Sequence, residues 1–172
     1  MPVPTAEPVV SAWRARYDAS AAEGMPAHIT ALYPFLDQDQ LTDSVMAQLC
    51  GLCARLPALD VEFARMGRFP AVLYLAPEPA ESLLRLTSTI AEQWPESPPY
   101  RGSFDEVIPH LTIADGIDDG MAAGIGHDLR KALPFRARLE EARLYVFDGV
   151  RWQLRARLPF QGQLGRFRSS TA

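Results

Sequence analysis

Two histidines of this chain are each followed, two positions later, by a threonine. The two triplets are His28-Ile29-Thr30 and His110-Leu111-Thr112. In an extended strand side chains alternate between two faces, so the histidine and threonine of a triplet share one face and the aliphatic residue takes the other. The pattern therefore predicts two strands that bury Ile29 and Leu111 and turn an imidazole and a hydroxyl away from the core.

The composition is that of a globular protein. The chain has 172 residues, of which 48% are hydrophobic, which is enough to bury a sizeable core in one domain. It contains no apolar run of the roughly 18 residues that a membrane span needs. The first seven residues lack the basic and apolar regions of a secretion signal. We expect a cytoplasmic protein that does not insert into membranes.

Charge is distributed unevenly along the chain. The net charge is −4, yet residues 130–172 carry ten basic side chains and three acidic ones. The overall acidity argues against binding to long DNA by charge alone, whereas the basic last third favours small or short anionic ligands. Arg151, Arg155 and Arg157 also fit a simpler interpretation, in which alternating arginines mark the solvated face of a strand.

The hydrophobic periodicity predicts a mixture of helices and strands. Helices are expected near residues 7–17, 41–56, 79–94 and 121–133. Strands are expected at 27–33, 59–63, 72–75, 135–139, 142–148, 151–158 and at the second triplet, and a Pro-rich loop at 95–109. Because helices and strands do not alternate regularly, the order favours an α+β fold of mostly antiparallel sheets with helices outside.

Two further groups invite a functional interpretation that the pattern does not favour. Cys50 and Cys53 could form a redox dithiol or half a zinc site, but they lie in a helical stripe of apolar residues, which favours core packing. His127 lies in a glycine-flanked helical segment and is expected at the surface.

The paired triplets suit chemistry at phosphorus. A neutral imidazole can take a proton from an attacking oxygen, and a protonated one can give a proton to the leaving oxygen. We therefore predict that His28 and His110 are catalytic. The hydroxyls of Thr30 and Thr112 can donate to the non-bridging oxygens of the phosphate. This scheme requires no metal and no other cofactor.

Residues 24–35 and 107–114 resemble the two motifs of the two-histidine (2H) phosphoesterase superfamily, in its bacterial 2′-5′ RNA ligase-like branch. The likeness extends over most of residues 5–160 and includes Gly67-Arg68-Phe69-Pro70 and the turn at 149–152. It implies a bilobal α+β fold with two mostly antiparallel sheets, outer helices and a central cleft. One departure is that only residues 1–4 are available for the strand that usually precedes the first helix.

The resemblance also implies a function. It implies a metal-independent phosphoesterase that acts on 2′,3′-cyclic phosphates or 2′-5′ linked nucleotide and RNA ends, with no cofactor. We expect residues 1–164 to form a single bilobal domain that acts as a monomer and residues 165–172 to form a polar tail. Candidate substrate contacts are Tyr33, Tyr100, Phe104 and Arg151, with Arg68 and Arg101 as further phosphate contacts.

Two other functions stay open at this point. A metal hydrolase could use His28, His110 and Asp115 as ligands, and activity in a strong chelator would exclude it. An RNA-binding module without turnover could use the basic last third together with stacking aromatic residues. Those aromatic residues are Tyr33, Phe35, Tyr100, Phe104 and Trp152.

Overall fold

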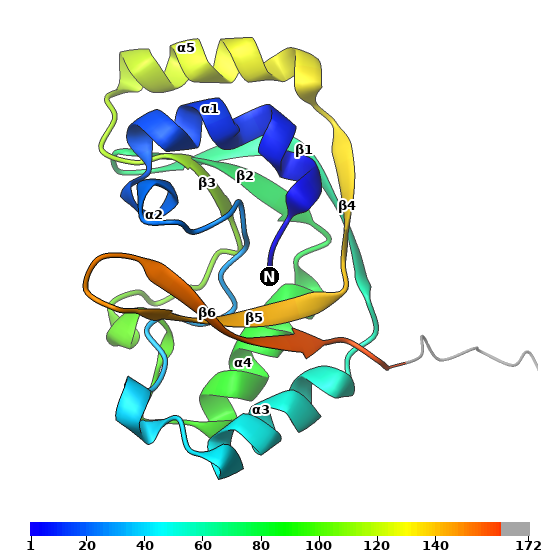
Figure 1. The fold of residues 1–172 in the computed structure, drawn as a ribbon. Helices are drawn as coiled ribbons and strands as arrows, with labels where there is room; N and C mark the ends of the chain where they lie inside the picture. Colours follow the sequence, from blue (N-terminus) through cyan, green and yellow to red (C-terminus); the bar gives the residue numbers. More distant parts are fainter. Residues whose placement is uncertain (163–172) are drawn as a thin grey trace, which may run out of the picture.

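The computed structural model describes residues 1–162 (Figure 1). The predicted tail at 165–172 lies outside the described residues. The helices are α1 (Glu7–Tyr17), α2 (Ala19–Ala22), α3 (Asp43–Ala54), α4 (Glu81–Gln93) and α5 (Asp119–Leu129), with 3-10 turns at Pro4–Ala6, Gln38–Gln40, Pro99–Gly102 and Arg130–Ala132. The strands are β1 (Leu59–Phe69), β2 (Val72–Glu78), β3 (Leu111–Ala114), β4 (Phe135–Leu139), β5 (Glu141–Phe147) and β6 (Trp152–Pro159).

The strands form two antiparallel sheets. One has four strands in the order β3-β2-β1-β4, and the other is the β5-β6 hairpin. β1 and β2 are joined by a tight turn that includes Ala71 at φ 62° and pairs Phe69 with Val72. The predicted α+β class with antiparallel sheets is therefore confirmed, and all four predicted helices are present within a few residues of their expected bounds.

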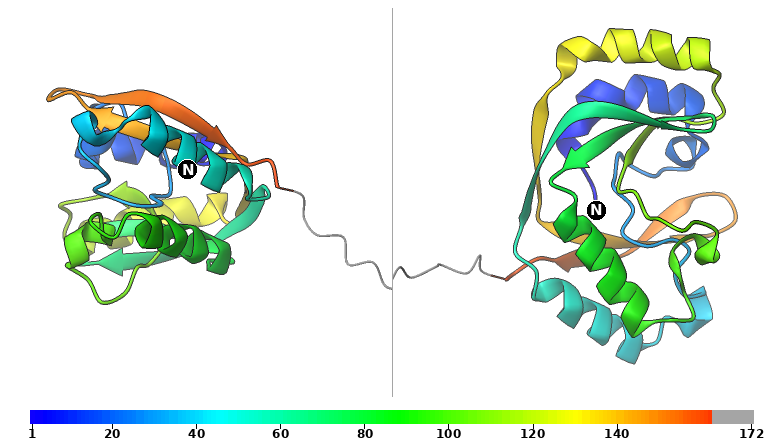
Figure 2. Two further views of the ribbon diagram at one scale, coloured as in Figure 1. Left: turned by 90° about the horizontal axis from the view of Figure 1, so that it is seen from below. Right: turned by 180° about the vertical axis from the view of Figure 1, so that it is seen from behind.

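The two sheets lie in two halves of the molecule. In the upper half of Figure 1, α1 contacts β3, and Gly126 of α5 lies next to the Met66 side chain of β1. In the lower half, α3 packs against β6. The α4 helix lies in the same half, where the Thr87 hydroxyl donates to the carbonyl of Ala31 over 2.6 Å. The view from behind in Figure 2 shows the same division.

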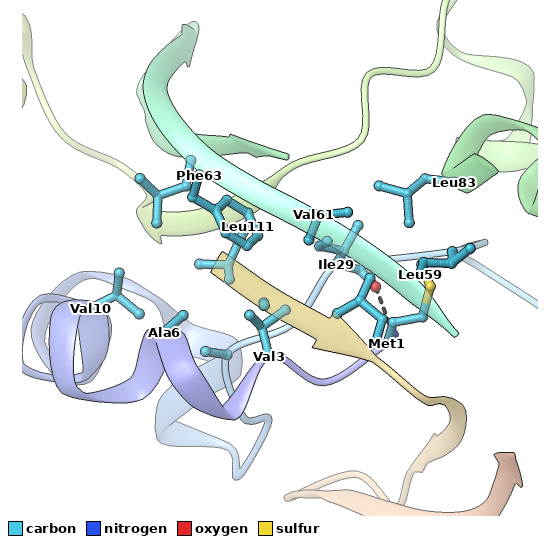
Figure 3. Close-up of a cluster of buried hydrophobic side chains, with 14 of the residues drawn as sticks. Met1, Val3, Ala6, Val10, Ile29, Leu59, Val61, Phe63, Leu83 and Leu111 are labelled. Atoms are coloured by element: carbon cyan, nitrogen blue, oxygen red, sulfur yellow. Dashed lines mark hydrogen bonds between the residues drawn. The ribbon is translucent and has the colours of Figure 1, made fainter. Parts of the chain in front are cut away.

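The middle residues of both triplets are buried in one core. Ile29 and Leu111 are both 0% exposed, and both belong to a single hydrophobic cluster that also contains Val10 and Phe63. Figure 3 shows Ile29 and Leu111 in that cluster, with β1 passing beside them. The prediction that these two aliphatic residues are buried is confirmed.

The predicted strand at 27–33 is wrong over most of its length. His28 forms an isolated antiparallel bridge with Pro2, flanked by bonds from Ile29 N to Met1 O (2.9 Å) and from Val3 N to Ala27 O (2.8 Å). The partner segment turns into a 3-10 helix directly after Val3, so it offers no longer edge for pairing. The following residues, 31–34, form bends instead of a strand. Residues 1–4, the only ones available for the strand that usually precedes the first helix, thus contribute a single bridge at Pro2.

Two smaller predictions can also be checked. Cys53 is fully buried in the core, as predicted, whereas Cys50, for which core packing was also favoured, is exposed. His127 is exposed on α5, as expected. Within residues 1–162, no helix has both the length and the apolar character needed to cross a bilayer.

Candidate active site

Helix α1 holds the segment that leads into the first triplet. Arg14 Nη2 donates to the carbonyl of Met25 over 3.2 Å, and Glu7 Oε1 accepts a bond from the backbone of Ala27 at 2.7 Å. Arg14 is itself fixed by a bond from its Nε to Asp18 Oδ2 at 2.9 Å. Two side chains of one helix therefore fix the backbone just before His28.

The second triplet lies at the start of an edge strand. β3 begins at Leu111, and Thr112 is paired with Tyr74 of β2. Just beyond β3, the backbone N–H of Asp115 donates to the carbonyl of Tyr17 at the end of α1, over 2.7 Å. Helix α1 thus fixes both the segment before His28 and the residue that follows β3.

The two histidine rings are oriented in the same way. His28 Nδ1 lies 2.8 Å from the carbonyl oxygen of Pro26, and His110 Nδ1 lies 2.8 Å from that of Ile108. A carbonyl oxygen can only accept, so Nδ1 carries the proton in each ring. In the neutral form Nε2 is therefore the basic nitrogen of both imidazoles, which is the arrangement needed to accept a proton from a ligand or from water.

The pKa of His28 is lowered to about 4. Burial is the largest cause, because it disfavours the charged ring, and the α-amino group of Met1 and the Arg14 guanidinium lower it further. The bond to Pro26 and the charge of Asp18 act in the opposite direction. Burial also lowers the pKa of His110, and its bond to Ile108 opposes this. At neutral pH, His28 is therefore an unprotonated base in the free protein.

This shift predicts how stability depends on pH. The folded pKa of His28 lies below its unfolded value of 6.5, so the folded state loses stability as pH falls from about 6.5 towards 4. Urea unfolding of wild type and His28→Gln at pH 7, 6 and 5 measures this effect. We expect the wild type to lose more stability than the variant over this range. Equal losses would contradict a buried, unprotonated His28.

A cavity of about 600 Å³ lies beside the first triplet and within the range of small-molecule sites. His28, Thr30 and Tyr33 line it, together with Thr112 of the second triplet. Residues 142–147 of β5 also belong to its lining. The structure thus brings three of the four residues of the predicted histidine and threonine set to one cavity.

His110 itself is not among the lining residues. Its ring packs edge-on against Phe69, with centroids 5.1 Å apart, and lies 5.5 Å from the ring of Tyr74. Tyr74 is the strand partner of Thr112, which does line the cavity. His110 therefore lies next to the part of β3 that reaches the cavity.

The other candidate contacts are divided between the cavity and its surroundings. Tyr33 lines the cavity and is 51% exposed. Tyr100 and Phe104 do not line it and pack against each other, with ring centroids 5.5 Å apart. Arg151 does not line it either, and its backbone is bound by Asp148 Oδ1 at 2.7 Å.

The two remaining arginine candidates also lie elsewhere. Arg68 forms an ion pair with Asp119 over 2.6 Å. Arg101 is exposed within the 3-10 turn at Pro99–Gly102, with a φ of 57°. Neither is among the residues that line the cavity.

An aromatic wall, which we define as Tyr33, Phe147 and Trp152, borders the cavity. The Trp152 ring lies 6.1 Å from Tyr33 and 5.2 Å from Phe147. Glu23 fixes Trp152 twice: its carbonyl accepts from the backbone N–H at 2.9 Å, and its Oε2 accepts from the indole Nε1 at 3.1 Å. Trp152 was a stacking candidate from the sequence, whereas no sequence signal connects it with Glu23 or points to Phe147.

The ligand set of the alternative metal hydrolase does not assemble. Within residues 1–162, no three His, Cys, Asp or Glu side chains gather closely enough to hold a metal ion. Asp115 instead accepts a bond from the backbone of Gly116 at 2.7 Å. His28, His110 and Asp115 are therefore not a metal site in this part of the chain.

The sequence model described as "2'-5' RNA ligase superfamily" matches residues 1–151, most of the chain. The chain belongs to this superfamily. Among curated relatives of the chain is the protein named Putative phosphoesterase SSP1770 from Staphylococcus saprophyticus, 29% identical over 143 residues, which cover 81% of this chain and 82% of the relative. A Bacillus cereus protein, also named Putative phosphoesterase, is 28% identical and covers 68% of this chain and 67% of its own.

Two solved structures of Escherichia coli LigT have the same fold as this superfamily member. The structure with NADP+ matches with a TM-score of 0.57 and 18% identity and covers 95% of this chain and 94% of LigT. The structure with 3'-AMP matches with a TM-score of 0.53 and 16% identity and covers 91% of each chain. The 2H resemblance and the LigT-like α+β fold are thereby confirmed.

Proposed function

We propose that this superfamily member is a metal-independent phosphoesterase for 2′,3′-cyclic phosphates or 2′-5′ linked nucleotide and RNA ends. His28 and His110 act as its acid-base pair, and Thr30 and Thr112 bind the reacting phosphate. The observation that carries the proposal is the burial of Ile29 and Leu111 in one core. The residues that flank them in the triplets, His28, Thr30 and Thr112, line one cavity.

The lowered pKa of His28 suggests the direction of proton transfer for hydrolysis of a cyclic phosphate. His28 Nε2 takes a proton from water, and the water oxygen attacks phosphorus in line with the leaving ribose oxygen. His110, protonated when the anionic substrate is bound, gives its Nε2 proton to that oxygen. The product is a phosphomonoester, and at the end of the step His28 has gained one proton and His110 has lost one.

The aromatic wall offers a place for the nucleobase. Aromatic side chains stack on any base, because every base has a π-face. The two LigT structures are complexes with nucleotides, NADP+ and 3'-AMP, which supports a nucleotide ligand for this chain as well. We propose that Tyr33 and Trp152 contact the base while the phosphate lies against the threonines.

A substrate panel tests the proposed function. Nucleoside 2′,3′-cyclic phosphates and 2′-5′ and 3′-5′ dinucleotides are incubated with the protein, with and without EDTA, and the products are separated by chromatography. We expect turnover of a cyclic phosphate or a 2′-5′ linkage at the same rate in EDTA. Loss of activity in EDTA would favour a metal hydrolase. Binding without any turnover across the panel would favour an RNA-binding module.

The threonines provide a second, quantitative test. Replacing Thr30 or Thr112 with valine keeps the side-chain shape and removes the hydroxyl donor. We expect each variant to lose ten- to hundredfold in kcat/KM, the typical value of a hydrogen bond to a charged group. The control is Thr89→Val, since the Thr89 hydroxyl on α4 bonds within its own helix, to Arg85 O at 2.8 Å. A valine variant of either triplet with wild-type kcat/KM would exclude that threonine as a phosphate ligand.

A further inference from the structure

Two arginines lie directly opposite each other on the β5-β6 hairpin. Arg143 pairs with Arg157, and the next pair along the ladder is Ala142 with Leu158. Ala142 and Leu158 are both buried in the core. Because side chains alternate along each strand, Arg143 and Arg157 share the face of the hairpin that is turned away from the core.

This arginine pair, Arg143 and Arg157, has excess positive charge. Like charges directly opposite each other destabilise a sheet unless something compensates them. Glu141 compensates one of them, since its Oε1 accepts from Arg143 Nε and lies 2.6 Å from Nη2. Arg157 has no ion pair with any residue of the described part, 1–162. Within the described residues, an acidic side chain therefore compensates the charge of Arg143 but not that of Arg157.

Arg143 belongs to the lining of the cavity. Among residues 1–162 it is the one arginine or lysine in that lining, and its side chain is only 20% exposed. A guanidinium has five N–H donors, so the contacts with Glu141 on Nε and Nη2 and the hydrogen bond to the Tyr145 side chain orient the group and leave donors for a ligand. Such a held guanidinium is suited to bind phosphate oxygens.

Arg143 is close to the first triplet and distant from the aromatic end of β5. The α-amino group of Met1 links the two: it donates to the carbonyl of Ile29 in the first triplet over 2.7 Å, and, after burial, the charge of Arg143 lowers its pKa. Phe147 lies four residues further along β5, about 13 Å at the usual rise of a strand. The arginine end and the aromatic wall are thus separate parts of one cavity lining.

We propose that Arg143, supported by Arg157, binds a second phosphate of the substrate, next to the one that reacts. The substrate class is then an oligonucleotide end, or a nucleotide with an additional phosphate, in preference to a nucleoside with the cyclic phosphate alone. This inference rests on the proposed function, because it assigns the reacting phosphate to the histidines and threonines. A phosphate at Arg143 also relieves the repulsion between the two arginines.

The test compares substrates that differ by one phosphate. Adenosine 2′,3′-cyclic phosphate is assayed with and without a 5′-phosphate, together with a dinucleotide that ends in the cyclic phosphate. We expect Arg143→Gln to raise KM about tenfold for the two substrates with the extra phosphate and to leave KM for the smaller one unchanged. Arg157→Gln, on an exposed side chain, is expected to have a smaller effect in the same direction. Arg85→Gln, an exposed arginine on α4, controls for net charge and should change neither KM.

Binding is measured in parallel, so that the two proposals can fail separately. Calorimetry compares adenosine 3′-phosphate with adenosine 3′,5′-bisphosphate for the wild type and the same variants. A wild-type protein that prefers the bisphosphate but turns over no substrate would overturn the proposed function and support the subsite. Equal losses by Arg143→Gln on all substrates would place Arg143 at the reacting phosphate and overturn the subsite. No loss with either arginine variant would overturn it as well.

Discussion

Replacing either His28 or His110 with alanine is expected to lower kcat/KM for a cyclic phosphate by about 10³- to 10⁴-fold. In the proposed mechanism each ring performs one of the two proton transfers, and general acid-base catalysis by a positioned group contributes about 10²- to 10⁴-fold. The two losses should not add when both rings are removed, because the two transfers belong to one step. Steady-state kinetics of the two single variants and the double variant measure this.

The control for these variants is His127→Ala, since His127 is exposed on α5. We expect it to have wild-type kinetics. Far-ultraviolet circular dichroism and thermal unfolding establish that His28→Ala and His110→Ala are folded. If a folded variant of either histidine retained near wild-type kcat/KM, the paired mechanism would be refuted. A residual activity confined to one variant would instead show that the remaining ring performs the more demanding transfer.

The second large effect is expected from the ion pair between Arg14 and Asp18. The two side chains lie 2.9 Å apart and are 3% and 8% exposed. Removing one partner of a buried pair leaves an uncompensated charge, which costs about 3 to 5 kcal/mol. Arg14→Ala is therefore expected to lower the free energy of unfolding by about this amount, measured by urea denaturation.

A matched control is available on the four-stranded sheet. Arg138 pairs with Asp60 at 2.8 Å, but both side chains are more than half exposed. Exposed pairs contribute about 1 kcal/mol or less, so Arg138→Ala should have a small effect. Equal losses in the two variants would show that the Arg14 pair is not the buried support of the His28 segment. Arg14→Lys keeps the charge and is expected to restore part of the lost stability.

Local patterns in the sequence predicted much of this fold. Alternation around Val61 and the apolar run at 72–75 predicted strands that are present as β1 and β2, and apolar residues at helical spacing predicted α4. These elements are confirmed because their periodicity reflects burial against a core, which each segment carries in its own residues. The burial of Ile29 and Leu111 followed from the same reasoning.

The failures share a physical cause, which is dependence on distant partners. The strand predicted at 27–33 needed a long neighbouring edge, and the segment beside His28 provides only Met1 to Val3. The contact between Glu23 and Trp152 joins residues 129 positions apart, and periodicity does not report such a pair. Tyr100 and Phe104, selected by residue type in a loop, do not line the cavity and stay predicted substrate contacts, because the path of a loop is set by the elements it connects.

For the site, too, local patterns in the sequence were informative and contacts with distant partners were not. The triplets predicted both histidines and both threonines around one cavity, and His28, Thr30 and Thr112 line it, whereas His110 does not. The role of Arg143 could not be derived in this way. Its significance depends on the register that places it opposite Arg157, and on which face of β5 borders the cavity.

The shared burial of Ile29 and Leu111 links the packing of the core to the spacing between the two histidine-threonine triplets. Since both triplets are anchored in one hydrophobic cluster, the distance between them depends on the volume of the side chains in that cluster. A methyl group gained or lost in that cluster would shift one triplet relative to the other without any change in a residue that contacts the ligand. Substitutions in the core can therefore change which ligand sizes are accepted.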